Sequence, residues 1–464
     1  MNTHFPAPVL IEEIARTYVD GPHPLDQKFN LRCGGGGLES DGSPVATPLT
    51  VPGSAVLFMG PNACGRHSSL GGCFMSNMWY LRLEERDIVS GLNAKRAKEA
   101  LLEMARTCNP KPKVIFLCVT CVDMLLASDY RAVVAQVEAE TGIRIGRALM
   151  CPLLNESKTP DPTRTWNFVS EVLRTDKNAP KEATVNLIGN YTRLDPSSDL
   201  CQLLKEAGFD RVNHLAGCQD LQEFDRIGQA SYNLAYNHAG LLACRNMEKR
   251  YQIPYAQVVT SFDPDVIHRN YQVISDLIGK EIDDSVWYEK TKARIAEVAA
   301  RCAGKTIVVG ETLDNDPFRA VAELCRLGFP VSAVFTRFVK PEYKENVLWL
   351  QENHPEIKVY FSAHPGMYNY PPQPDHFDLA FGLDSDYTNG DKTILTVSGA
   401  ERQPDYSSIL AFMDRVENAL NGVPPAEPFS LSMLAGNGGA KVLGHTGRNQ
   451  KQWGHYRSAM GGKE

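Results

Sequence analysis

Apolar runs that end in a glycine recur three times along the chain, at residues 55–60, 184–189 and 306–310. A stretch whose apolar residues have helical spacing follows each glycine. Short buried runs that alternate with helices are typical of parallel β-sheets with both faces covered. The pattern therefore predicts an α/β protein with parallel sheets and right-handed crossovers, and it places ligands beyond the carboxyl ends of the strands.

The third repeat is the clearest, because strand, loop, helix and second strand follow one another between residues 304 and 338. The acidic residues from Asp314 to Asp316 suit a helix N-terminus, and Gly328 suits the turn that ends a helix. The second repeat has the same plan, with a helix in LCQLLKEAGFD that ends at Gly208. Each segment is therefore predicted to form a strand–helix–strand unit.

A chain of 464 residues is too long for one ordinary core, and its length predicts roughly three domains. We place the boundaries near residues 182 and 304, and the polar stretches at 155–164 and 175–183 have the composition of loops or linkers. The prediction is three Rossmann-like domains, namely an N-terminal domain at 1–182, a second at 183–303 and a third at 304–464. From Pro424 onward the chain is rich in glycine and polar residues, and both a docking arm and a mobile tail fit that composition.

Composition and charge narrow the function classes. Apolar content of 43% and charged content of 22% are those of a globular protein, and a net charge of −7 argues against a general nucleic-acid binder. There is no apolar run of about 18 residues, and the N-terminus lacks the basic region followed by an apolar stretch that marks a secretory signal. We therefore expect a cytoplasmic protein without a membrane partner. In that compartment the twelve cysteines are expected to be thiols rather than disulfides.

Three of these cysteines, Cys33, Cys64 and Cys121, occupy places where early segments of the chain turn. Cys64 and Cys121 follow apolar runs that read as strands, and Cys33 precedes four glycines. Thiolates at strand ends, beside glycines that permit close backbone approach, are suited to an iron–sulfur cluster. The alternative is three unrelated buried thiols, and spacing alone leaves both open.

Two neighbouring motifs have simpler interpretations. GPNACGRHSS has the glycine spacing of a phosphate-binding loop, but Arg66 and His67 replace its lysine and hydroxyl residue, so nucleotide binding is disfavoured. Cys118 and Cys121 form a C-x-x-C pair, which suggests a redox pair or half of a zinc site. VIFLCVT reads as a buried strand, however, so Cys118 is predicted to be core while Cys121 lies at the strand end. Cys73 is also predicted to be a packing residue rather than a ligand.

Taken together, several segments resemble the component 1 subunits of nitrogenase and nitrogenase-like reductases. The segments are GPNACGRHSS, VTCVDMLLASD, RNMEKRYQIPY at 245–255, GKTIVVGETLD and PDYSSILAFMDRVENAL at 404–420. The resemblance implies three similar α/β domains, a homologous sister subunit in an α2β2 heterotetramer, and a separate ATP-dependent iron–sulfur reductase as electron donor. It also implies that Cys33, Cys64 and Cys121 hold one half of an interface cluster, either [4Fe–4S] or a P-cluster-like [8Fe–7S]. A second iron–sulfur cofactor elsewhere in the complex is compatible with the family.

The sequence departs from the nitrogenase α-type subunit, which binds its active-site cofactor through one cysteine and one histidine. Tyr236 falls near the cysteine position, and Thr396-Val397-Ser398 fall near the histidine position. The chain is therefore either a β-type subunit or a subunit that binds a different cofactor. The remaining candidates near a central cleft are His67, His238, Cys244, His364 and His376, each of which has an ordinary structural interpretation. His238, in a helix-like stretch, is the catalytic candidate to test first.

These observations lead to a subunit that relays low-potential electrons through an iron–sulfur cluster to a reducible substrate. Reductive cleavage of the carbon–sulfur bond of methylthio-alkanes is the first choice of chemistry. The alternatives are a tetrapyrrole reductase of the protochlorophyllide, chlorophyllide or nickel-sirohydrochlorin type, a nitrogenase subunit, and a cofactor-assembly scaffold. An α/β binding protein without a cluster is the non-enzyme alternative.

Overall fold

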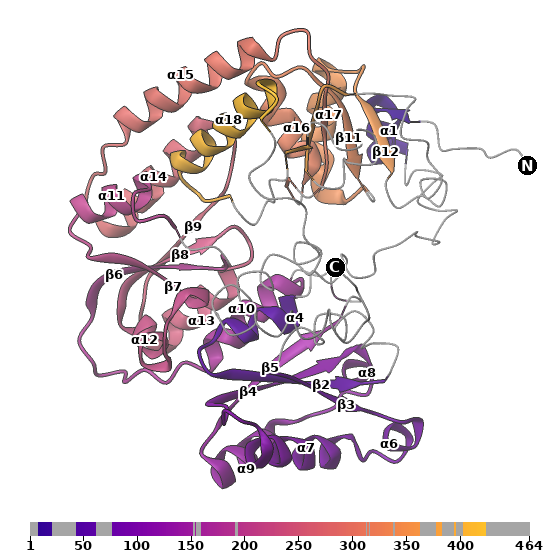
Figure 1. The fold of residues 1–464 in the computed structure, drawn as a ribbon, viewed down its shortest axis with the longest axis vertical. Helices are drawn as coiled ribbons and strands as arrows, with labels where there is room; N and C mark the ends of the chain where they lie inside the picture. Colours follow the sequence, from indigo (N-terminus) through magenta and orange to yellow (C-terminus); the bar gives the residue numbers. More distant parts are fainter. Residues whose placement is uncertain are drawn as a thin grey trace, which may run out of the picture. The chain divides into compact units, whose positions relative to one another are not determined.

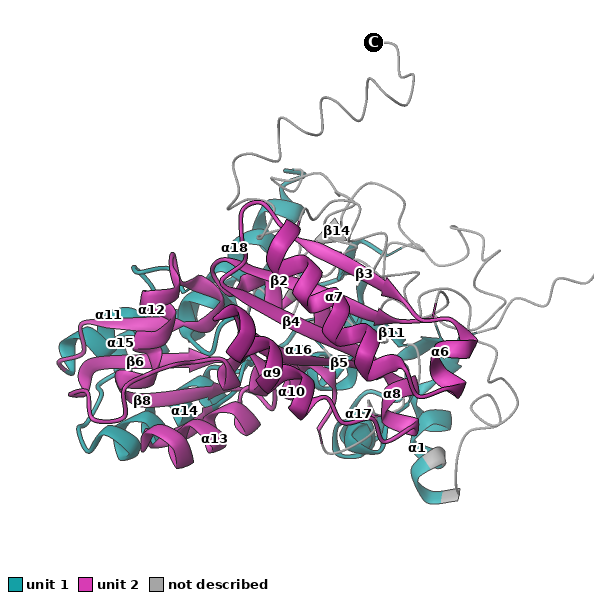
Figure 2. Cartoon of the chain, turned by 90° about the horizontal axis from the view of Figure 1, so that it is seen from below, with its two compact units in different colours: residues 1–35, 194–207, 258–429 teal, residues 36–193, 208–257, 430–464 magenta. Residues whose placement is uncertain are grey.

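The computed structural model describes residues 8–20, 43–61, 77–151, 154, 159–190, 194–311, 313–314, 316–336, 339–361, 377–382, 394–395 and 402–423. The chain divides into two compact units, which Figure 2 shows in different colours. Unit 1 comprises residues 1–35, 194–207 and 258–429, and unit 2 comprises residues 36–193, 208–257 and 430–464. Within the described ranges, no helix is both long and apolar enough to cross a membrane.

Unit 2 contains a first sheet of four parallel strands in the order β3-β2-β4-β5. The strands are β2 (Ser54–Gly60), β3 (Met78–Arg82), β4 (Val114–Thr120) and β5 (Arg144–Met150). Every residue of β2 is buried, because helices cover both faces of the sheet. One face carries α7 (Asn93–Thr107) and α9 (Arg131–Thr141), and the other carries α4 (Ser43–Ala46) and α10 (Asp161–Glu171) (Figure 1).

The second sheet of unit 2 has the strand order β7-β6-β8-β9. Its elements are β6 (Glu182–Ile188), β7 (Arg211–His214), β8 (Ala230–Tyr236), β9 (Tyr255–Val258), α12 (Leu221–Arg226) and α13 (Leu241–Tyr251). The helix α13 packs on α10 of the first sheet. There Asn246 Nδ2 donates to Asn167 Oδ1 at 2.6 Å, and Arg250 Nη1 donates to the Ser170 carbonyl at 3.1 Å. This helix pair joins the two sheets into one core.

Unit 1 contains the third sheet, with the order β1-β12-β11-β10-β13-β14. Its strands are β1 (Val9–Leu10), β10 (Ile307–Val309), β11 (Val331–Thr336), β12 (Lys358–Phe361), β13 (Leu379–Phe381) and β14 (Ile394–Leu395). The edge strand β1 pairs antiparallel with β12, whereas the other pairs are parallel. Three helices belong to this part of the unit, namely α1 (Ile11–Asp20), α16 (Pro317–Arg326) and α17 (Lys344–Asn353).

Four further helices belong to the described part of unit 1, namely α11 (Asp199–Glu206), α14 (Pro264–Ile278), α15 (Ser285–Arg301) and α18 (Tyr406–Leu420) (Figure 1). Asp199 connects three of them. Its carboxylate accepts hydrogen bonds from Tyr271 Oη at 2.6 Å, from the Tyr406 amide at 2.9 Å and from the Ser407 amide at 2.7 Å. The start of α18 is therefore held against α11 and α14 by one buried acidic side chain.

The structure confirms the predicted parallel α/β fold class. The three predicted strands are β2, β6 and β10, and Asp316 caps α16 by accepting from the Arg319 amide at 3.0 Å. Gly208 and Gly328 follow their helices with φ of +97° and +88°, a conformation that glycine adopts without steric cost. The domain boundaries near residues 182 and 304 stay predictions.

Candidate functional site

The carboxyl edge of the first sheet brings together the chain segments that leave β2 and β4. These two strands pair in parallel, with Phe58 opposite Cys118, and β2 ends at Gly60. A Cβ atom on Gly60 would lie 2.8 Å from Cγ2 of Thr120, the last residue of β4. Glycine at this position therefore lets the two strand ends approach closely, so the residues that follow them start side by side.

Cys121 is the first residue of α8 (Cys121–Leu125), directly after β4. It is partly exposed, whereas Cys118 of the same C-x-x-C pair is fully buried. Burial raises the pKa of the Cys118 thiol strongly, and the nearby carboxylates Asp161 and Asp123 raise it further. The prediction that Cys118 is a core residue is confirmed, and Cys121 occupies the strand-end position expected of it.

The other two cysteines predicted to hold a cluster, Cys33 and Cys64, lie outside the described residues. The same is true of further candidates and motif residues, namely Arg66, His67, Cys73, His364, His376 and 396–398. Among the residues that the structure describes, no group of three histidine, cysteine or acidic side chains is arranged to hold a metal ion. Cys121 is thus the one proposed cluster ligand that lies among the described residues.

His238 lies in a turn between β8 and α13, and its side chain is exposed. The prediction that it belongs to a helix-like stretch is wrong, because α13 begins only at Leu241. The turn is set by a close approach to the end of β6, since a Cβ atom on Gly240 would lie 2.0 Å from the Ile188 carbonyl oxygen. The His238 carbonyl accepts from Thr163 Oγ1 at 3.2 Å.

The remaining candidates of the second sheet are structural in character. Cys244, in α13, is fully buried, and burial raises the pKa of its thiol strongly. Tyr236 is the last residue of β8 and is largely buried. A neutral phenol and a core thiol are poor metal ligands, because ligation by either requires the deprotonated form.

An ion-pair cluster beyond β10, at the carboxyl edge of the third sheet, was not predicted from the sequence. Asp314 Oδ2 accepts from Arg319 Nη2 and from Arg402 Nη1, both at 2.6 Å. Although burial opposes ionisation, the two guanidinium groups lower the pKa of Asp314. The acidic pattern at 314–316 signals a helix cap, but nothing local reveals Arg402 as a partner. The shared carboxylate ties the loop after β10 to α16 through Arg319 and to the segment before α18 through Arg402.

Two cavities lie away from the carboxyl edges. One of about 690 Å³ adjoins the amino ends of strands in the third sheet and is lined by residues that include Thr306, Val331 and Lys358. The other, of about 480 Å³, adjoins Arg144, the first residue of β5, and Asp225. In parallel α/β sheets ligands bind beyond the carboxyl ends, so neither cavity is the expected site.

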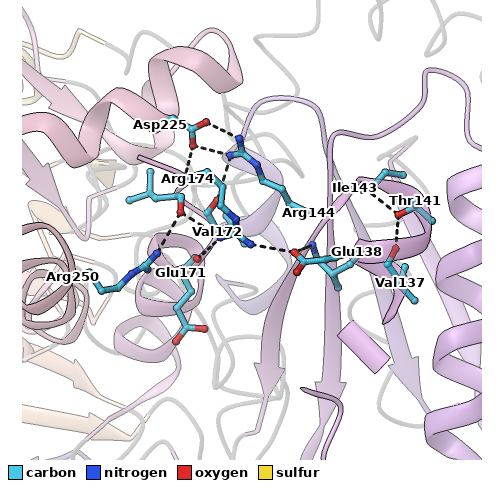
Figure 3. Close-up of polar contacts among 12 residues, drawn as sticks. Val137, Glu138, Thr141, Ile143, Arg144, Glu171, Val172, Arg174, Asp225 and Arg250 are labelled. Atoms are coloured by element: carbon cyan, nitrogen blue, oxygen red, sulfur yellow. Dashed lines mark hydrogen bonds and ion pairs between the residues drawn. The ribbon is translucent and has the colours of Figure 1, made fainter. Parts of the chain in front are cut away.

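The second cavity adjoins a polar junction inside unit 2 (Figure 3). Arg144 makes two parallel hydrogen bonds of 2.7 Å to the Asp225 carboxylate, and Asp225 also accepts from the Arg174 amide at 2.9 Å. The Arg174 side chain reaches Glu138 at 3.1 Å. This arrangement links β5 to α12, and its charges are already paired.

Comparison with known proteins gives a consistent picture. The family model of nitrogenase component 1 type oxidoreductases matches residues 45–369. A curated relative, the nitrogenase iron-molybdenum cofactor biosynthesis protein NifE of Clostridium pasteurianum, is 24% identical over 233 residues. That match covers 48% of this chain and 50% of the relative, so the chain spans about half the length of the curated relative it matches.

Two solved structures share the fold. "Nitrogenase Cp1 at pH 6.5" superposes with a TM-score of 0.60 and 14% identity, covering 82% of this chain and 91% of that one. "Nitrogenase Cp1 at pH 5" superposes with a TM-score of 0.53 and 15% identity, covering 89% of this chain and 97% of that one. At such low identity the likeness concerns the fold alone.

Proposed function

We propose a function for this chain on the premise that it belongs to the nitrogenase component 1 type oxidoreductase family. The proposal is a subunit of a nitrogenase-like catalytic component that holds an iron–sulfur cluster and relays low-potential electrons through it. The observation that carries the proposal is the position of Cys121 at the carboxyl edge of the first sheet, next to the strand end from which the chain continues to Cys64.

The donor set suits the proposed group. Iron–sulfur clusters are held by cysteine thiolates, and the proposed ligands are Cys33, Cys64 and Cys121. Three thiolates from one chain leave a cubane-type cluster one ligand short, which favours a site completed by a homologous sister subunit. When bound, the group supplies one-electron transfer at low potential. The chain's own contribution is to hold the thiolates in place and to set the burial and hydrogen bonding around them.

Two features suit Cys121 to this role, namely the fixed backbone on either side of it and the partial exposure of the residue. Its backbone lies between the last ladder residue of β4 and the first turn of α8. The side chain is partly exposed, so its sulfur can meet a ligand without disruption of the core. Cys118, three residues earlier, is enclosed among apolar side chains and has no such freedom.

The proposed partners are a homologous sister subunit in an α2β2 assembly and an ATP-dependent iron–sulfur reductase. The proposed substrate chemistry is the two-electron, two-proton cleavage of a methylthio-alkane to methanethiol and an alkane. The reductase supplies both electrons. The sequence resemblance puts Tyr236 near the position of the nitrogenase cofactor cysteine, and this residue is largely buried at the end of β8, which supports a chemistry other than dinitrogen reduction.

The first test is anaerobic purification of the complete complex, followed by iron and sulfide analysis. Cys121→Ala is expected to lower the iron content, because it removes a proposed ligand. Cys118→Ala is the matched control, since it removes a thiol three residues away that lies inside the core. Equal iron contents in the two variants would contradict the assignment of Cys121. Iron-free wild-type complex would overturn the cluster proposal altogether.

A cofactor-assembly scaffold is the second candidate, and the name of the curated relative favours it. A scaffold transfers its cofactor to an acceptor protein, whereas a reductase turns over substrate while retaining its metal. The loaded complex, supplied with reductase, ATP and a methylthio-alkane, is expected to release methanethiol. Absence of that product, together with transfer of iron to a cofactor-free acceptor, would favour the scaffold.

A further inference from the structure

A buried polar network lies behind Cys121 on the inner side of α8. Its members are Asp123, Asn93 and Tyr130, which are 3%, 8% and 7% exposed. Asn93 begins α7 and Tyr130 precedes α9, so the network links α8 to both helices that cover this face of the first sheet. We call these three residues the Asp123 network.

In each side-chain hydrogen bond of Asp123 the carboxylate is the acceptor. Asp123 Oδ2 accepts from the Thr120 amide at 3.3 Å. Asp123 Oδ1 accepts from Tyr130 Oη and, at 3.4 Å, from Asn93 Nδ2. Asn93 Nδ2 also lies 2.9 Å from Tyr130 Oη. Two carboxylate oxygens offer enough lone pairs to accept from all three donors at once, so the side chain is held from several directions.

The hydrogen bond to Thr120 constrains the backbone around Cys121. Thr120 is the N-cap of α8 and Asp123 is its third helical residue, so the bond closes a ring around the first turn. Cys121 is the first residue inside that ring. Fixing the turn at both ends restricts the direction of the Cα–Cβ bond of Cys121, and a metal ligand needs such restriction to keep its geometry.

The Asp123 charge also acts at the end of β4. It contributes to the raised pKa of the Cys118 thiol, after burial itself and Asp161. A charge in a low-dielectric interior is poorly screened, so its potential reaches neighbouring groups. At a cluster, added negative potential stabilises the oxidised state relative to the reduced state, and the reduction potential becomes more negative.

We propose that Asp123 is a positioning residue for Cys121 and that its buried carboxylate makes the reduction potential of the cluster held there more negative. This inference rests on the proposed function. It adds to that function a specific residue that orients one ligand and tunes the electron-transfer site from within the same chain. Tyr130 and Asn93 hold the carboxylate in place and disperse part of its charge through their hydrogen bonds.

The test compares three variants in the complete, anaerobically purified complex. Asp123→Asn preserves the size of the side chain and removes its charge. Tyr130→Phe preserves the ring and removes a donor that disperses that charge. Asp129→Asn is the matched control, because Asp129 lies on the same stretch of chain but is exposed and already paired with Arg131. The readouts are iron content, the electron paramagnetic resonance spectrum and the midpoint potential from redox titration.

At unchanged iron content, Asp123→Asn is expected to shift the midpoint potential in the positive direction. Tyr130→Phe is expected to shift it in the negative direction, and Asp129→Asn is expected to leave it unchanged. If Asp123 had a purely structural role, the potentials of Asp123→Asn and Tyr130→Phe would not be expected to shift in opposite directions. An unchanged potential and spectrum in Asp123→Asn, with normal iron, would overturn the inference and leave the proposed function intact. If Asp123→Asn does not fold, a potential in Tyr130→Phe equal to that of the wild type would overturn it.

Discussion

Replacing Gly60 with alanine probes the close approach of β2 and β4 on which the candidate site depends. The new Cβ atom would lie 2.8 Å from Thr120 Cγ2, whereas carbon atoms in contact prefer about 3.5–4.0 Å. Thr120 is fully buried and every residue of β2 is buried, so neither strand can easily move away. Overpacking of this kind costs about 1–3 kcal/mol.

Removing the Thr120 side chain beyond Cβ should relieve this cost. In a Thr120→Ala background the nearest atom to the new Cβ, apart from Thr120, is Phe58 Cε1 at 3.6 Å, which is an ordinary contact. Gly60→Ala should then be neutral or stabilising by up to about 1 kcal/mol, because alanine reduces the entropy of the unfolded chain. The expected coupling between the two substitutions is about 1–3 kcal/mol.

Native-state hydrogen exchange, read by mass spectrometry, measures this effect locally. Peptides that contain β2 and β4 are expected to exchange roughly 5–140 times faster in Gly60→Ala than in the wild type, which corresponds to the loss of about 1–3 kcal/mol. The double variant should exchange no faster than Thr120→Ala alone. Peptides from β10 and β11 serve as an internal control. Unchanged exchange in Gly60→Ala, or simple additivity in the double variant, would refute the steric argument.

Three further predictions concern charged groups. Burial raises the pKa of Asp316 to about 6. The stability that Asp316 contributes is therefore full below about pH 4 and is lost as the pH rises through 6. The melting-temperature advantage of the wild type over Asp316→Asn should shrink between pH 4 and 7. Burial and then the Asp199 charge raise the pKa of Asp405 well above its usual value. Asp405→Asn keeps an acceptor for the Ser408 amide, and its melting temperature should exceed that of the wild type at pH 8 by a margin that closes on acidification. Asp225→Asn breaks the two-bond ion pair with the partly buried guanidinium of Arg144. Urea titration should show that the free energy of unfolding falls by about 1–3 kcal/mol. A midpoint equal to that of the wild type would show that the pair does not contribute to stability.

Local pattern was sufficient for the strands and helix ends on which the fold depends. The seven-residue strand β4 has the bounds expected from its apolar run, so Cys118 lies inside the strand and Cys121 directly after its end. The Asp316 cap and the turn at Gly328 follow from the chemistry of single residues. These features are accessible because each depends on residues that are neighbours in sequence.

The error at His238 and the omissions around the site have a common cause. Helical spacing near His238 continues into α13, but the start of that helix is set by Gly240 packing against Ile188, a contact with another strand. The role of Asp123 depends on Asn93 and Tyr130, which come from other elements. Such partners carry no local signature, since any polar residue can stand at the same place in an exposed loop.

By itself the amino-acid sequence determined the parallel α/β architecture, the strand-end position of Cys121 and the resemblance to a family of multi-subunit reductases. Tertiary structure alone decided which strands are neighbours, so that Gly60 meets Thr120, and which carboxylate is buried behind Cys121. It also decided that Arg402 pairs with Asp314. The physical reason is that propensity and periodicity act over a few residues, whereas burial and charge pairing depend on where distant segments meet.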